Sequence, residues 1–155
     1  MSNPYFQTSF YFSLQISGGS GSADAAFQEV SGLSAEIGIE EVASGGQNMF
    51  KYRLPGVMTY PNLVLQRGIA FDSSPLISWC QRILSGGLGS PIQTKNLVLS
   101  LLDANGQSSM SWSFTNAYPI KWKVADLSAK EGNILIETIE LAYQYFVVTD
   151  PRSAP

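Results

Sequence analysis

Alternation of apolar and polar residues constrains this chain most, because a period of two residues fits a β-strand and not a helix. Between Ser9 and Ser17, one face carries only apolar residues, namely Phe10, Phe12, Leu14 and Ile16. Extended patterns recur at residues 27–30 and 33–41, and again at 57–67, 96–103, 110–114, 120–124 and 133–148. The sequence therefore predicts about six or seven half-buried strands.

Turn signals separate these strands and indicate antiparallel pairing. Asp103-Ala104-Asn105-Gly106 lies between two alternating segments, which is typical of a β-hairpin. A polar break is expected over residues 43–48, and Pro55-Gly56 is expected to interrupt the chain again. Pro119 is expected to separate the strand that ends near Phe114 from the one over residues 120–124.

One segment, residues 75–84, has the spacing of a helix. Ser74 is a suitable N-cap, Pro75 suits the first turn, and Gly86-Gly87 ends the pattern. The apolar residues that share one helical face are Leu76, Trp79, Cys80 and Ile83. We therefore expect a mainly β fold, an antiparallel β-sandwich or partial barrel of about six or seven strands with one helix.

The chain length of 155 residues fits a single domain over residues 1–155, with a loose end at about 150–155. Charged residues make up only 14% of the chain, against about 25% in ordinary soluble domains. Apolar residues make up 45%. Either uncharged polar residues and glycine cover the surface, or contact with other subunits does. Because bare apolar patches favour association, we expect surface to be buried against other subunits.

Several classes of function are disfavoured by what the chain lacks. With no histidine, it cannot form a catalytic Ser-His-Asp or Cys-His system or an imidazole metal site. Cys80 is expected to be a buried structural thiol. Glu40 and Glu41 are adjacent, so on a strand they point to opposite faces and cannot act together as acid and base. We therefore expect no enzyme activity, no catalytic residue, no cofactor and no metal.

The chain shows no feature of a membrane or nucleic-acid-binding protein. No apolar run approaches the roughly 20 residues of a membrane span, and residues 1–7 do not resemble a secretory signal. The nine Lys and Arg residues are scattered. We therefore expect folding in the cytoplasm, without membrane insertion and without a nucleic-acid-binding face.

An ordered set of motifs extends over most of the chain. The first block runs from Gly32-Leu33 through Glu40-Glu41, Gly45-Gly46-Gln47-Asn48, residues 51–54 and Pro55-Gly56 to the segment 62–68. The second block comprises residues 114–119, Trp122, Ile136-Glu137 and Leu141-Ala142-Tyr143. Together the two blocks resemble the contractile phage tail tube protein family, the inner-tube subunits of contractile phages and related injection particles, over about residues 3–148.

This resemblance implies a structural subunit that stacks as hexameric rings into a hollow tube and conducts cargo. In this family, strands of neighbouring subunits join into one barrel around the lumen. The implied partners are further copies of the chain, a contractile sheath, baseplate and spike proteins, and protein cargo or DNA in the lumen. The implied location is a phage tail or an injection particle, released or membrane-attached, after assembly in the cytoplasm.

Two other functions remain compatible with the sequence. A baseplate tube initiator, an adaptor of the same machine, shares the fold and many of the motifs. A small lipocalin-like β-barrel that binds a ligand inside itself would also show alternating strands. Electron microscopy of concentrated protein distinguishes the ligand-binding barrel from the tube subunit. The number of copies per particle distinguishes the initiator from the tube subunit.

The resemblance places ring-to-ring contact in the glycine-rich segment 42–56, which the pattern predicts as a loop between two strands. Long loops between strands are more often functional than idle. The residues of this expected ring-stacking loop are Ser44, Gly45, Gly46, Gln47, Asn48, Pro55 and Gly56.

The polar faces of residues 33–41 and 133–148 predict a channel lining. If the apolar residues of both segments face the core, the alternate positions face outward, and in a tube that means toward the lumen. The expected lumen-facing residues are Ser34, Glu36, Glu40, Thr138, Glu140 and Gln144. The absence of Lys and Arg from residues 24–50, which contain five acidic residues, further predicts a mildly acidic channel.

Overall fold

The structure is a computed structural model that describes residues 10–17, 24–43, 45–46, 50–68, 74–125 and 135–149. Its strands are β1 (Tyr11–Ile16), β2 (Asp24–Phe27), β3 (Glu29–Ser31), β4 (Glu36–Ala43), β5 (Lys51–Thr59), β6 (Leu63–Gly68), β7 (Lys95–Leu102), β8 (Ser108–Val124), β9 (Ile136–Ala142) and β10 (Tyr145–Thr149). The helix α1 spans Pro75–Gly86 and continues into a short 3-10 turn, η1 (Gly87–Gly89).

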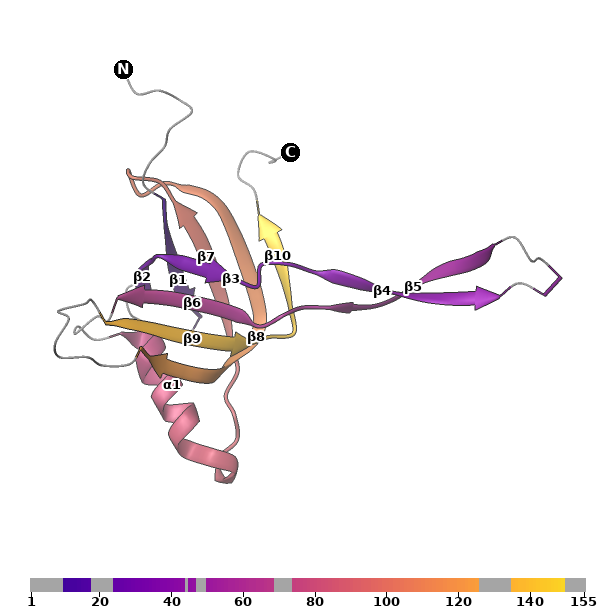
Figure 1. Ribbon diagram of the computed structural model, residues 1–155. Helices are drawn as coiled ribbons and strands as arrows, with labels where there is room; N and C mark the ends of the chain where they lie inside the picture. Colours follow the sequence, from indigo (N-terminus) through magenta and orange to yellow (C-terminus); the bar gives the residue numbers. More distant parts are fainter. Residues whose placement is uncertain are drawn as a thin grey trace, which may run out of the picture.

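The body of the molecule is an antiparallel sheet that curls into a half-barrel (Figure 1). Its strand order is β2-β1-β7-β8-β9-β6-β3, with β10 added beside β8. The end strands β2 and β3 are consecutive segments of the chain, so residues 24–31 pair with β1 at one end and with β6 at the other. The predicted fold class, an antiparallel partial barrel with one helix, is confirmed.

Strand β8 connects the two halves of the sheet. Its first part pairs with β7 and β10, and its last part pairs with β9. The predicted break at Pro119 is wrong, because the strand continues through this residue with a register shift between Pro119 and Lys121. A bulge tolerates a proline that cannot donate a ladder hydrogen bond.

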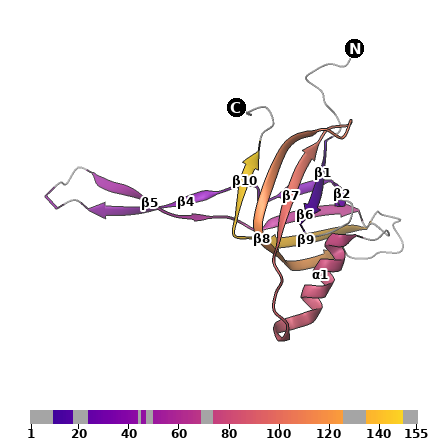
Figure 2. The same cartoon turned by 180° about the vertical axis from the view of Figure 1, so that it is seen from behind.

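The core lies inside the curl of the sheet and consists of fully buried side chains from both halves: Leu14, Phe27, Leu63, Leu65, Leu97, Leu99, Phe114, Ala117, Ile139 and Leu141. Helix α1 adds Leu76, Trp79 and Cys80 at one end of the half-barrel (Figure 2). Ser74 caps the helix by accepting a hydrogen bond from the Ile77 amide, as predicted. Cys80 is buried, as also predicted.

The predicted hairpin between β7 and β8 is confirmed. The Asp103 carboxylate accepts hydrogen bonds from the amides of Asn105 and Gln107 at 2.9 Å each, and Gly106 has a φ of 80°. An aspartate that binds the backbone in this way stabilises a tight turn.

Two predicted strands are divided in the structure. The segment 133–148, expected as one strand, contains β9 and β10, which pair with different parts of β8. The segment 57–67 contains the end of β5 and then β6, with Tyr60, Pro61 and Asn62 between them.

Candidate assembly interface

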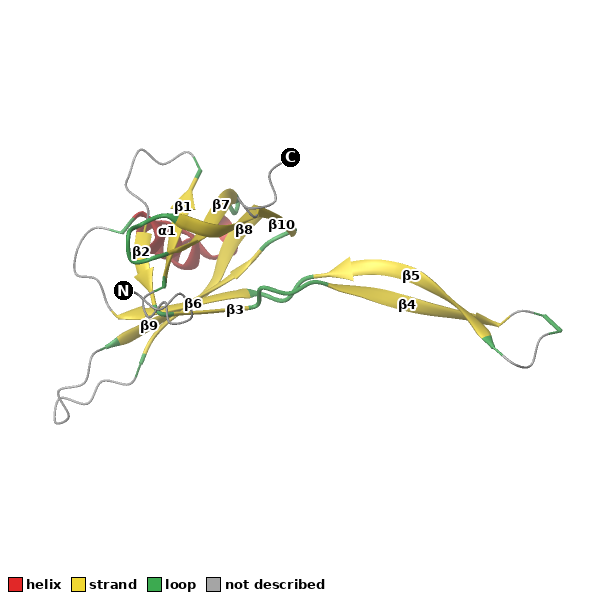
Figure 3. Cartoon of the chain, turned by 90° about the horizontal axis from the view of Figure 1, so that it is seen from above, coloured by secondary structure: helices red, strands yellow, loops and turns green. Residues whose placement is uncertain are grey.

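Strands β4 and β5 form a two-stranded hairpin that extends far from the half-barrel (Figure 1, Figure 3). Nearly every residue of both strands is exposed, including large apolar ones. Ile37 is 47% exposed, Ile39 53%, Tyr52 51% and Val57 79%. An isolated two-stranded hairpin is at best marginally stable in water, so such a ribbon needs a second surface to cover it.

The register of this hairpin shifts once along its length. Ile37 lies opposite Met58, but Ile39 lies opposite Pro55, so β5 has one more residue than β4 between these pairs. The backbones are close at the shift, because a Cβ added to Gly56 would lie 3.2 Å from the Gly38 carbonyl oxygen. Gly38 and Gly56 thus permit a β-bulge in the middle of the ribbon.

The two faces of the hairpin have opposite gradients of polarity, because residues opposite each other in a ladder share a face. One face is apolar near the body and charged toward the tip: Ile37, Met58, Ile39 and Pro55, then Glu41, Arg53 and Lys51. The other is polar near the body and apolar toward the tip: Glu36, Thr59 and Glu40, then Leu54, Val42 and Tyr52. The apolar surface therefore changes face along the ribbon, and each face offers its own contact area.

The structure corrects two expectations from the sequence, one about residues 33–41 and one about residues 42–56. Leu33 packs against the core, but the apolar residues of β4 do not face it, since Ile37 and Ile39 are exposed and their strand does not belong to the half-barrel. Segment 42–56 is not mainly a loop, and Pro55-Gly56 does not break the chain but lies within β5. The bulge accommodates both residues without ending the ladder.

The expected ring-stacking residues fall in two places. Gly45 and Gly46 lie in the turn at the tip, where Gly46 has a φ of 91° that favours glycine. Pro55 and Gly56 lie at the bulge, away from the tip. Ser44, Gln47 and Asn48 lie outside the described residues.

An aromatic cluster lies where the hairpin joins the body. Tyr60, which follows β5, contacts the rings of Tyr143 and Phe146 at centroid distances of 5.9 and 5.4 Å. Tyr143 also packs edge-on against Phe114 at 4.8 Å. Burial, and then the neighbouring Tyr60, raise the pKa of Tyr143 to about 12. Among the described residues the Tyr143 hydroxyl has no hydrogen-bond partner.

A second candidate surface is the outer face of the sheet β3-β6-β9-β8. Thr138 and Glu140 lie on this face of β9, because the alternate residues Ile139 and Leu141 are fully buried. The Asn62 side chain donates a hydrogen bond to Glu140 Oε1 at 2.9 Å. Lys121 lies opposite Glu140 and Lys123 opposite Thr138, so this face carries charges of both signs.

The six expected lumen-facing residues therefore divide between elements. Thr138 and Glu140 share one face of the body, and Glu36 and Glu40 share one face of the hairpin. Ser34 is exposed between β3 and β4. Gln144 accepts a hydrogen bond from the Asn116 side chain at 2.8 Å, at the corner between β9 and β10.

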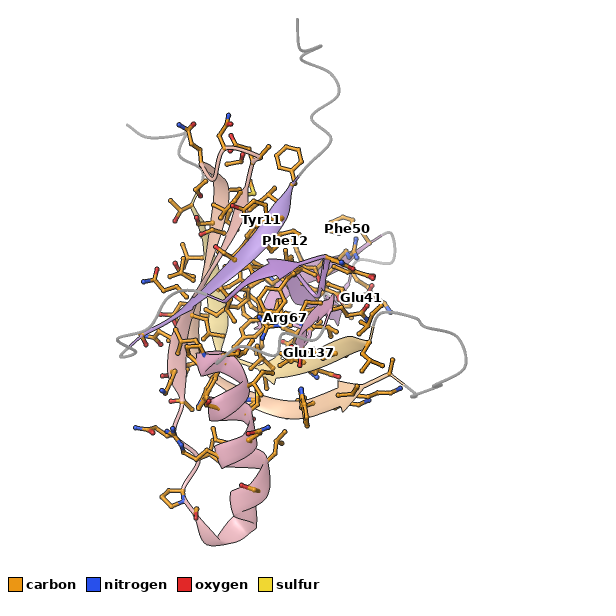
Figure 4. All side chains as sticks on the ribbon, turned by 90° about the vertical axis from the view of Figure 1, so that its left-hand side faces the viewer. Tyr11, Phe12, Glu41, Phe50, Arg67 and Glu137 are labelled. Carbon is orange, nitrogen blue, oxygen red and sulfur yellow. The ribbon has the colours of Figure 1, made fainter. Side chains whose placement is uncertain are left out.

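A buried ion pair between β6 and β9 was missed by the sequence analysis. Arg67 Nε donates to Glu137 Oε1 at 2.6 Å, and both side chains are 4% exposed (Figure 4). Arg67 also donates to the Ser74 hydroxyl at 2.9 Å, and Trp122 Nε1 donates to Glu137 Oε2 at 3.2 Å. The sequence contained an indication of this pair, because both charged residues occupy positions that the alternation assigns to the core. Arg67 lies two residues from Leu65, and Glu137 lies two residues from Ile139.

The described residues contain no constellation that suggests catalysis or metal binding. No group of three acidic or cysteine residues could hold a metal ion in the part of the chain that is described. Glu40 faces Leu54 and Glu41 faces Arg53, so the adjacent glutamates point to opposite faces, as predicted. Within the same residues, no helix is long and apolar enough to span a membrane.

Comparisons with known proteins agree with this architecture. A chain in the cryo-EM structure of the anti-feeding prophage (AFP) baseplate, 6-fold symmetrised, is 30% identical, with coverage of 97% of this chain and 98% of that chain and a TM-score of 0.75. A search of curated proteins found no match.

Two more distant structures share the fold. A chain of the sheath-tube complex of an extracellular contractile injection system (PVC) in the extended state is 22% identical, covering 95% of this chain and 93% of that chain, with a TM-score of 0.74. Hcp1 from Salmonella typhimurium is 19% identical, covering 91% of this chain and 86% of that chain, with a TM-score of 0.52.

The family model described as T4-like virus tail tube protein gp19 matches residues 8–147. This match covers the β4–β5 hairpin and all of the half-barrel except the last two residues of β10. The family is one of structural tube proteins. The chain belongs to the T4-like virus tail tube protein family.

Proposed function

We propose that this chain forms hexameric rings that stack into the hollow inner tube of a contractile injection machine, and that the tube conducts cargo inside a sheath. The observation that carries the proposal is the β4–β5 hairpin, an exposed apolar ribbon that extends from a half-barrel body. The AFP baseplate relative comes from a structure symmetrised 6-fold, which supports rings of the same order.

Head-to-tail contact between copies explains both parts of the molecule. Contacts around a ring close the assembly, whereas contacts along the axis do not close and generate a filament. We assign the hairpin to the axial contact, with the expected stacking residues Gly45, Gly46, Pro55 and Gly56, together with Ser44, Gln47 and Asn48. Covering the ribbon would remove its apolar side chains from water. This burial stabilises the contact by about 25 cal/mol for each Å² of apolar surface.

A substitution in the apolar end of the hairpin tests this assignment. Val42→Ser combined with Leu54→Ser removes apolar surface from one face without touching the half-barrel core. We expect a folded subunit that forms rings but no tubes, as seen by negative-stain electron microscopy. Replacing residues 44–48 with a short tight turn should have the same effect.

The matched control is Glu36→Gln with Thr59→Ser, which lie on the same face of the ribbon near the body. This variant should form tubes of normal length. Tubes of normal length from the Val42→Ser, Leu54→Ser variant would contradict the role of the hairpin in stacking.

A baseplate tube initiator is the second candidate, because the relative with 30% identity over 97% of this chain comes from a baseplate structure. An initiator would be present in one or a few rings per particle, and a tube subunit in many. Quantitative mass spectrometry of purified particles, with the sheath protein as reference, distinguishes them by copy number.

We propose further that the chain acts as a single domain without enzyme activity, cofactor or metal. Its partners in this proposal are other copies of itself, the sheath and baseplate or spike proteins, with protein cargo or DNA in the lumen. It assembles in the cytoplasm before it becomes part of a particle.

A further inference from the structure

The outer face of the sheet β3-β6-β9-β8 carries positive and negative side chains in equal number. Gln66 and Thr138 lie on this face, because Leu65 and Ile139 beside them are fully buried. Residues opposite each other in a ladder share a face, so the pairings with Gln66, Thr138 and each other identify its charged members. These are Glu29, Glu140, Lys121 and Lys123. Among the described residues of the four strands, the formal charges on this face therefore sum to zero.

Both lysines lie close to a carboxylate of their own copy. Lys121 lies directly opposite Glu140, and Lys123 is the diagonal neighbour of Glu140. Cβ atoms at such positions are about 5 Å and about 7–8 Å apart, which does not exceed the Debye length of about 8 Å at physiological ionic strength. The Asn62 side chain donates to Glu140 Oε1 at 2.9 Å and holds this carboxylate on the face. A charged group that approaches either lysine therefore also meets the field of Glu140.

The core side of the same sheet adds no net charge within the described residues. Its charged side chains there are Arg67 and Glu137, which are buried and form an ion pair. Because the potential at a surface is the sum over all nearby charges, a complete pair beneath the sheet leaves the balance of the outer face unchanged.

The acidic residues that predicted an acidic channel lie mostly on other elements. Of the five acidic residues in segment 24–50, only Glu29 belongs to this sheet. Asp24 lies on β2, and Glu36, Glu40 and Glu41 lie on the β4–β5 hairpin. The acidity of this segment is therefore not concentrated on the outer face of the body.

We infer that this face presents a charge-balanced wall to the channel, and that the cargo it fits is polypeptide of either net charge. The inference rests on the proposed tube and names the class of its cargo. A wall of one sign attracts cargo of the opposite sign and repels cargo of its own sign, whereas a balanced wall does neither beyond the spacing of its charges. Nucleic acid gains its main electrostatic affinity from cations that neutralise phosphates, and this wall has no surplus of cations.

The probes that test the balance are two fluorescent peptides of equal length, one rich in glutamate and one rich in lysine. Each is incubated with preassembled wild-type tubes at low salt, and the fraction that sediments with the tubes is measured. We expect the two fractions to agree within about threefold, because the wall selects neither sign. A single-stranded oligonucleotide with the charge of the acidic peptide should be taken up no more than that peptide.

Two neutralising variants test whether this face lines the channel. Lys121→Gln leaves a negative wall, and Glu140→Gln leaves a positive wall in which the amide oxygen can still accept the hydrogen bond from Asn62. Since every subunit repeats the change, Lys121→Gln should favour the basic peptide by about fivefold or more, and Glu140→Gln the acidic peptide by a similar factor. Both preferences should decline at physiological salt because of screening.

Arg82→Gln is the matched control for Lys121→Gln, since it removes one positive charge from the exposed side of α1. Tubes of this variant should take up the two peptides as wild-type tubes do, with tube length checked by negative-stain electron microscopy.

Three outcomes would overturn the inference while leaving the proposed tube intact. They are a preference of wild-type tubes for either peptide beyond about threefold, uptake of the oligonucleotide well above that of the acidic peptide, and a Lys121→Gln variant that behaves like Arg82→Gln. A wild-type chain that forms no tube at any concentration would instead contradict the proposed function, and the inference with it.

Discussion

At the residue scale, Arg67 and Glu137 form a buried ion pair within the body. Their pairing is direct, and Ser74 and Trp122 supply further hydrogen bonds. The Arg67 guanidinium also lies 4.7 Å from the centre of the Phe27 ring. The network therefore connects β6, β9, the end of β8 and the N-terminus of α1, and Phe27 of β2 lies against it.

Removing one member of this pair leaves a buried charge without its partner. We expect Arg67→Met or Glu137→Leu alone to lower the free energy of unfolding by about 3–5 kcal/mol. The double variant should lose much less, because no unpaired charge remains. Urea denaturation of dissociated subunits measures all three values, and equal losses for single and double variants would contradict this account.

Tyr143 provides a pH-dependent prediction. Its pKa rises to about 12 in the folded chain from 10.0, so the unfolded state releases the proton first as the pH increases. The contribution of the neutral Tyr143 side chain to the free energy of unfolding is therefore fully present below about pH 10, and it is lost as the pH rises toward 12. We expect Tyr143→Phe to resist this alkaline loss and to change stability at pH 7 by less than about 1 kcal/mol.

The measurement is thermal unfolding of wild type and Tyr143→Phe between pH 7 and pH 11. If the unfolding temperatures of the two proteins fell in parallel over this pH range, Tyr143 would not be the cause of the alkaline loss of stability. Tyr60→Phe serves as the comparison, since Tyr60 belongs to the same cluster.

Prediction from sequence succeeded at residues whose role is local. Ser74, Pro75 and Gly87 act through their immediate neighbours, and each takes its predicted place at the ends of α1. Arg67 and Glu137 were not found, because they are 70 positions apart and only strand pairing brings them together. A charged residue at a core position signals such a pair without identifying its partner.

At the scale of elements, Gly32 determines how the chain leaves β3 for the hairpin. It has a φ of 91°, and a Cβ there would lie 2.0 Å from the Asn62 carbonyl oxygen. We expect Gly32→Ala to destabilise the subunit by more than about 1 kcal/mol, since both the conformation and the space exclude a side chain. Gly45→Ala is the control, because nothing lies within 4 Å of its added Cβ. Similar unfolding midpoints for both variants would contradict this role.

The strands of the body were predicted well, whereas the hairpin was not. Alternation indicates that a strand has one apolar face, but it does not say what covers that face. In β6 and β9 the cover is the core of the same subunit. In β4 the same pattern remains exposed in the single chain, and we propose that other copies cover it. Both cases contain apolar residues at alternate positions, and this feature alone does not show which strands pair with the body.

At the scale of the whole molecule, the proposed channel lining can be tested at two sites. Cys80 is buried, so cysteines introduced at positions 36 and 140 would dominate labelling by a bulky thiol reagent. We propose that the body face that carries Thr138 and Glu140 lines the lumen, so a cysteine at position 140 should react slowly in tubes and rapidly in dissociated subunits. Equal rates in both states would contradict the assignment.

Glu36 tests the other half of the predicted lining. It lies on the hairpin, and its lumen position remains a prediction alongside those of Ser34, Glu40 and Gln144. Slow labelling at position 36 in tubes but not in isolated rings would place it at the contact between rings. Slow labelling in both would place it within the ring.

The central claim, that this chain assembles as stacked rings, is tested most directly by cryo-electron microscopy of the purified protein at high concentration. The account predicts hollow tubes of six-fold rings in which the β4–β5 hairpin of each subunit contacts the next ring. Monodisperse single subunits at every concentration, or tubes in which the hairpin contacts no other copy, would contradict it.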